Sequence, residues 1–155
     1  MSKLYTIHAA QIRKTGLALL LLIVLIAAGS CRAPQLMQTE FDGHLLKANE
    51  SEYVGKPLKT LLKQIKPPIK MVSATGERGH GEPGYFVFLF HDVEAQAAWR
   101  KVDRLSPRLT VFVKESFDWN RDSISIQERM QWTQKDLKKY GNLTIHYFRF
   151  SGKPL

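Results

Sequence analysis

Cysteine is nearly absent from this sequence, since Cys31 is the only one in 155 residues. A lone cysteine cannot form a disulfide within its own chain, so Cys31 needs another explanation. A structural zinc site built on paired cysteines is excluded for the same reason.

Motifs for catalysis and metal binding are missing as well. The five histidines show neither the H-x-x-x-H nor the H-E-x-x-H spacing. The sequence contains no G-x-S-x-G nucleophile elbow and no G-x-x-x-x-G-K-[ST] phosphate loop. We therefore expect a protein that is not an enzyme and that carries no metal ion and no other cofactor.

The first 30 residues lack acidic side chains but include Lys3, Arg13 and Lys14. An unbroken apolar run of 12 residues follows, from Leu17 to Ala28. As a helix this run would span roughly 18 Å, less than the roughly 30 Å hydrocarbon core of a bilayer. A basic start, a short apolar run and small residues at its end are typical of a secretory signal peptide. A retained transmembrane helix is the alternative.

The apolar run ends in Ala28-Gly29-Ser30-Cys31, which resembles the lipobox of bacterial lipoproteins. In that family the cysteine receives a diacylglycerol, the peptide before it is removed, and the new amino terminus is acylated. The resemblance covers residues 1–31 and departs from the family at Ala28, where leucine is usual. It implies a signal peptide over 1–30 and a membrane anchor on Cys31. Cleavage as an ordinary signal peptide, which leaves a free thiol on Cys31, is the alternative.

The residues after Cys31 include no aspartate and no acidic cluster. The lipoprotein resemblance then implies a periplasm-facing anchor in the outer membrane rather than the inner one. Beyond residue 30 the chain has 23 − 3 = 20 basic and 14 acidic residues, a net charge of +6. These charges are scattered, which suits a solvated surface or one that faces an anionic membrane or polysaccharide. We expect no nucleic-acid partner.

Hydrophobic periodicity predicts one small α+β domain over 52–155, preceded by a lipidated N-terminus and tether over 31–51. Helices are expected at 57–65, from Val93 to before Ser106, and at 134–140, the last two capped by Asp92 and Thr133. Strands are expected at 69–73, 85–90, 109–115 and 143–150. These elements predict a mixed four-stranded sheet with two or three helices packed on one face.

Two stretches of this domain carry finer predictions. The continuous apolar run at 85–90 predicts a central strand buried on both faces. Alternation along 143–150 places Ile145 and Tyr147 on one face and Phe148 on the other. Two alternative predictions stand for residues 118–131. The alternation at 123–126 predicts a strand, whereas a capping box of Ser125 and Glu128 predicts the start of a helix.

A binding loop is expected between the first two strands. The stretch 75–84 contains four glycines and one proline, which predicts a loop. Arg78 and His80 lie in it and His91 follows the next strand, so these three are the candidate ligand-binding residues. The three tryptophans could form a stacking platform, but helical spacing favours core packing for Trp99 and Trp132.

The function expected from the sequence is a non-catalytic binding domain tethered in the cell envelope. Its partner would be another envelope protein or an anionic polymer, as in an immunity or inhibitor lipoprotein. The alternative is a cell-envelope enzyme with its site near the loop 75–84.

Overall fold

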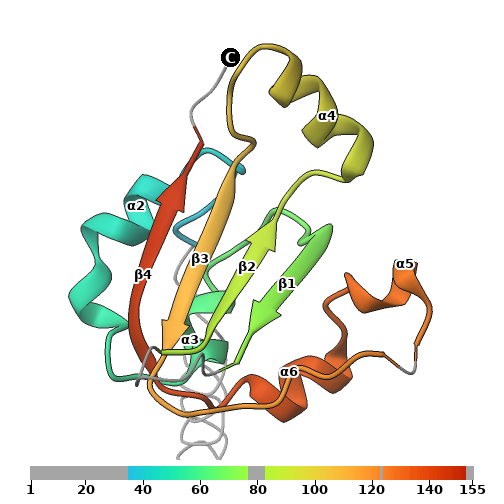
Figure 1. Ribbon diagram of the computed structural model, residues 1–155. Helices are drawn as coiled ribbons and strands as arrows, with labels where there is room; N and C mark the ends of the chain where they lie inside the picture. Colours follow the sequence, from blue (N-terminus) through green and yellow to red (C-terminus); the bar gives the residue numbers. More distant parts are fainter. Residues whose placement is uncertain (1–34, 77–82, 123, 153–155) are drawn as a thin grey trace, which may run out of the picture. The chain divides into compact units, whose positions relative to one another are not determined.

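The structure is a computed structural model that describes residues 35–76, 83–122 and 124–152 (Figure 1). In chain order the described elements are α2 (Gly43–Ala48), the 3-10 turn η1 (Glu50–Glu52), α3 (Leu58–Leu62), β1 (Met71–Thr75), β2 (Tyr85–Leu89), α4 (Val93–Lys101), β3 (Arg108–Val113), α5 (Ile126–Arg129), α6 (Gln134–Tyr140) and β4 (Ile145–Ser151). None of the helices in this part of the chain has the length and hydropathy needed to cross a bilayer.

The four strands form one sheet in the order β1-β2-β3-β4. The α+β class and the single four-stranded sheet are confirmed. The sheet is not mixed, however, because all three neighbouring pairs are antiparallel. Each strand pairs with the next strand along the chain, and each connection reverses the chain direction.

One face of the sheet holds the hydrophobic core. On β2, Phe86 and Phe88 are fully buried, whereas Tyr85, Val87 and Leu89 are only partly buried. The strand is central, as predicted, but the prediction that both its faces are buried is wrong. Helix α3 covers the inner face with its buried leucines and lies behind the strands in Figure 1.

The last strand changes its facing through a β-bulge. Phe112 pairs with Tyr147, but the next residue, Val113, pairs with Ile145, so one residue of β4 is left over. In a β-bulge, two residues of one strand lie opposite one residue of its partner strand. Ile145 therefore joins Phe148 in the core, and the prediction that they point to opposite faces is wrong.

The folded domain begins earlier than residue 52. Met37 and Leu46 are fully buried and belong to the same hydrophobic core as the strands. Met37 also forms a parallel bridge with Ile65 at the end of the α3 region. The described part of the stretch predicted as a tether is thus part of the domain.

The helix caps follow the local sequence signals. Asp92 Oδ1 accepts from the Ala95 backbone N–H at 2.9 Å, as predicted for the start of α4. Helix α6 has the predicted bounds and a capping box that begins at Thr133. Ser125 and Glu128 form the second capping box, so the helix α5 occupies part of the stretch for which a strand was the competing prediction.

Candidate binding surfaces

His91 is the one predicted ligand-binding residue that the structure describes, since Arg78, His80 and the predicted anchor Cys31 lie outside the described residues. Its ring stacks against Trp99 with centroids 5.7 Å apart, and its Nε2 lies 3.7 Å from a carboxylate oxygen of Glu40. Its Nδ1 is buried and has no hydrogen-bond partner among the described residues. His91 thus packs between α4 and the start of the domain. Within the described ranges, no three histidine, cysteine or acidic side chains converge as metal ligands would.

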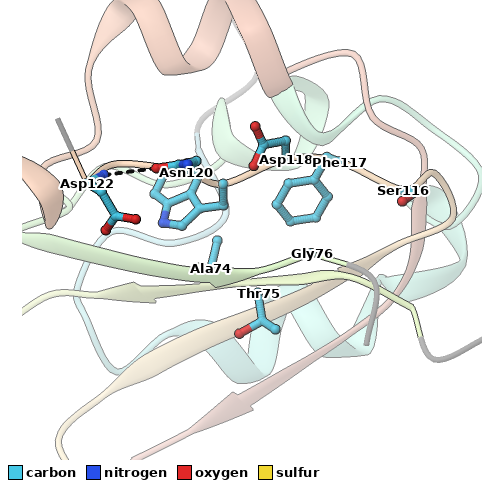
Figure 2. Close-up of a pocket in the computed structure, with 9 residues that line it drawn as sticks. Ala74, Thr75, Gly76, Ser116, Phe117, Asp118, Asn120 and Asp122 are labelled. Atoms are coloured by element: carbon cyan, nitrogen blue, oxygen red, sulfur yellow. Dashed lines mark hydrogen bonds between the residues drawn. The ribbon is translucent and has the colours of Figure 1, made fainter. Parts of the chain in front are cut away.

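A hollow lies where the chain enters and leaves the loop 75–84. The end of β1 forms one wall, and the segment after β3 forms the other, with the Phe117 ring pointing into the hollow (Figure 2). Its volume is about 820 Å³, and it is shallow and largely open to solvent. Asn120 Oδ1 accepts from the Asp122 backbone N–H at 3.0 Å, which fixes the far end of this wall.

Two glycines of the loop have a packing role beside this hollow. A Cβ on Gly76 would lie 2.3 Å from the backbone oxygen of Phe117, and one on Gly84 would lie 2.5 Å from the Phe117 ring. Only glycine allows the chain to pass this close. The glycine pattern that predicted a ligand loop is therefore explained in part by the fit of Phe117.

The acidic groups of the hollow are solvated. Asp118 is exposed, and the Asp122 side chain is 88% exposed. Perturbed acid–base groups normally depend on burial or close charges. The described residues of the hollow thus offer hydrogen-bond donors and acceptors but no desolvated pair of carboxylates.

Arg121 holds together the segment after β3, which forms the second wall of the hollow. It donates to the backbone oxygens of Arg129 at 3.1 Å and Gln131 at 2.9 Å, and it pairs with the Asp136 carboxylate. Burial alone would raise the pKa of Asp136, but hydrogen bonds from Thr133 and Arg121 outweigh it and hold that pKa below its usual value. No short sequence motif marks this contact, because it joins residues on separate elements.

Trp119 and Trp132 pack against the hydrophobic core, whereas Trp99 packs beside it, against Phe41 and His91. Trp99 is buried, as predicted for a helical core face. Trp132 packs edge-on against Phe88 at 5.1 Å, which confirms its predicted core packing, but it lies between α5 and α6 and not on a helical face. Trp119 packs against Phe86 at 5.6 Å and carries the Arg121 guanidinium 3.7 Å above its ring. The three tryptophan rings therefore all pack against other residues of the domain.

The outer face of the sheet is the more distinctive surface. No described helix is drawn over its middle in Figure 1, which views the sheet from this side. Strand alternation and pairing place twelve residues on it: Met71, Ser73, Thr75, Tyr85, Val87, Leu89, Arg108, Thr110, Phe112, Tyr147, Arg149 and Ser151. Two are arginines and none is acidic.

A row of three aromatic rings crosses this outer face. Tyr85 and Phe112 are paired residues with ring centroids 5.3 Å apart, and Phe112 stacks on Tyr147 at 4.2 Å. The Arg149 guanidinium lies 5.6 Å from the Phe112 ring centre and 5.4 Å from that of Tyr147. Because Phe112 and Tyr147 stack on each other, the row is a ridge of rings rather than a flat platform.

The second arginine of the outer face is less exposed. Arg108 is partly buried, and its Nε has no hydrogen-bond partner among the described residues. Buried polar atoms are usually paired, so the Arg108 Nε is an exception among the described residues. Alternation along β3 indicates one half-exposed face, because Arg108 and Thr110 alternate with the buried Leu109 and Val111, but the continuous apolar run of β2 gives no such sign.

Comparison of the chain with protein families, with curated proteins and with solved structures found no match.

Proposed function

We propose that this chain is a lipoprotein of the bacterial cell envelope whose domain binds another envelope protein through the outer face of its sheet. The lipobox-like sequence supports the tether, with Cys31 as the acylated residue. The observation that carries the binding role is the aromatic ridge of Tyr85, Phe112 and Tyr147 beside Arg149. Binding requires no catalytic residue and no cofactor.

The composition of the outer face favours a protein partner over an anionic polymer. Protein interfaces are enriched in aromatic residues and arginine, and their centres are depleted of acidic residues. A polysaccharide would need flat ring faces for stacking, whereas Phe112 and Tyr147 occupy each other's faces at 4.2 Å. The expected partner surface has an apolar centre with carboxylates positioned to meet Arg149 and Arg108.

Site-specific photo-crosslinking in intact cells tests this proposal. A photoreactive amino acid at Tyr147 should give one discrete protein adduct, and the same group at Ser51, an exposed residue of η1, should give none. Arg149→Glu should reduce the Tyr147 adduct by roughly 30-fold or more, the loss typical of an interface hot spot. Arg149→Lys keeps the charge and should retain part of the adduct.

Two results would contradict the proposal. Equal adducts from Tyr147 and Ser51 would mean that the outer face has no specific partner. A diffuse adduct that survives protease digestion would favour the anionic polymer instead. The intact mass of the membrane-bound protein, compared with a Cys31→Ala variant, tests the tether independently.

A further inference from the structure

The chain enters the described domain beside the end of α3. The Gln35 side-chain amide, in the first described residue, donates to the backbone oxygen of Lys63 at 3.0 Å. The Met37 backbone N–H donates to the Gln64 oxygen at 2.9 Å, and the Lys66 backbone N–H donates to the Met37 oxygen at 2.9 Å. These bonds fix the point at which the chain arrives from Cys31.

Two exposed lysines lie beside this entry point, and a third lies one turn away at the start of α3. Lys59 and Lys63 are one turn apart on α3, on the side opposite its buried leucines, and Lys66 follows the helix. None of the three lies within 4.0 Å of a described carboxylate, and Lys66 Nζ instead donates to the Gln38 side chain at 3.2 Å. The nearby carboxylate of Asp42 accepts from the backbone N–H groups of Gln38 and Thr39. We call Lys59, Lys63 and Lys66 the entry lysines.

The length of the connection limits how far the entry lysines can lie from an anchored cysteine. Cys31 and Gln35 are four residues apart, and a fully extended chain covers at most about 3.6 Å per residue, or roughly 14 Å in all. Acyl chains on Cys31 would insert into the bilayer and hold this residue at the headgroups. The entry lysines would then lie near the headgroups, where the membrane surface charge acts over a Debye length of ~10 Å.

We propose that the entry lysines contact anionic lipid headgroups and orient the tethered domain with its α3 side toward the membrane. The inference rests on the proposed function, because it requires the acyl anchor on Cys31. A lysine near an anionic membrane surface favours the bound state roughly fivefold. The acyl chains supply the affinity, and the lysines select one orientation among those that the short connection allows.

Amine labelling of the acylated protein in vesicles tests this inference. The full mature protein is reconstituted in phosphatidylcholine alone and in phosphatidylcholine mixed with phosphatidylglycerol. Labelling of Lys63 and Lys66 should be roughly fivefold slower in the anionic vesicles, and high salt should remove the difference. The exposed Lys101, at the end of α4, serves as the control and should label equally in both vesicles.

A matched pair of variants shows whether the entry lysines act together. Lys59→Gln with Lys66→Gln leaves Lys63 as the reporter and should abolish most of its protection. Arg100→Gln with Lys101→Gln removes the same charge from the exposed side of α4 and should leave Lys63 protected.

The outcomes separate the inference from the proposal on which it rests. If Cys31 carries acyl chains but Lys63 labels equally in both vesicles, or if Lys101 is protected as strongly as Lys63, the orientation is wrong and the anchor stands. An intact mass without acyl chains would overturn the lipoprotein proposal, and the inference with it.

Discussion

Gly43 sits where the first turn of α2 passes closest to β4. A Cβ at this position would lie 1.9 Å from Cδ2 and 2.1 Å from Cγ of Phe150, so the two elements can pack together only around a glycine. In the sequence Gly43 has the character of a loop residue. Its packing partner lies at the other end of the chain, where no local pattern connects the two.

Gly43→Ala should destabilise the domain by about 1–3 kcal/mol, the usual cost of overpacking a core. In an open helix the same change would be neutral or stabilising, because alanine is the better helix former. Urea unfolding followed by tryptophan fluorescence measures the difference.

Two further variants test the cause of this loss. Gly43→Ala combined with Phe150→Leu should be less destabilised than the sum of the single variants, since a smaller side chain makes room. Ser51→Ala, at an exposed position nearby, should change stability by no more than about 0.5 kcal/mol. A stable Gly43→Ala variant would mean that α2 is not held against β4 as the structure has it.

At the scale of elements, the segment between β3 and β4 depends on one ion pair. Arg121 holds the segment through backbone oxygens, and Asp136 both pairs with Arg121 and caps α6 through Thr133. The two side chains are 11% and 12% exposed, so each would be left nearly buried without its partner. Removing one member of such a pair typically costs about 3–5 kcal/mol.

Asp136→Asn should therefore lower the free energy of unfolding at neutral pH by about 3 kcal/mol. Because the folded-state pKa of Asp136 is below its usual value of 3.8, the stabilisation is complete above that value and is lost as pH falls through the lower folded-state pKa. The difference between wild type and variant should be largest at neutral pH and should shrink below about pH 4. Urea unfolding at both pH values measures it, and a difference that is constant with pH would contradict the assigned charge.

Local signals predicted the elements that depend on neighbouring residues. Thr133 and Asp136 are three residues apart, and their capping box sets the start of α6. Asp92 sets the start of α4 in the same way. Helix α2 has no side-chain cap, and its N-cap Asp42 bonds to residues before it, so no local signal marks its start.

Features that depend on strand pairing could not be predicted in this way. The bulge between Phe112 and Val113 changes the facing of β4, and it is decided by the partner strand. The outer face of the sheet is a similar case. The apolar run at 85–90 predicts a strand buried on both faces, because Tyr85 and Val87 are also hydrophobic residues, like the core residue Phe86 between them. Only the arrangement of helices shows which face is covered.

At the scale of the whole domain, the two proposed surfaces lie on opposite sides. Lys59 and Lys63 lie on the side of α3 away from the strands, since the buried leucines of α3 face the inner side of the sheet, and Lys66 follows the helix. The aromatic ridge lies on the outer face. If the α3 side rests on the membrane, the outer face points away from it, toward a partner in the periplasm.

This arrangement predicts different thiol reactivity on the two sides. Acylation of Cys31, the only cysteine, would leave an introduced cysteine as the single free thiol. Ser73→Cys, at an exposed position of the outer face, should react with a water-soluble maleimide at the same rate in anionic and neutral vesicles. Gln64→Cys, beside Lys63, should react several-fold more slowly in the anionic vesicles, by the factor of roughly five that one lysine contact provides. Slower reaction at Ser73→Cys instead would place the outer face against the lipid, and the ridge of Tyr85, Phe112 and Tyr147 would then be a membrane contact rather than a protein-binding site.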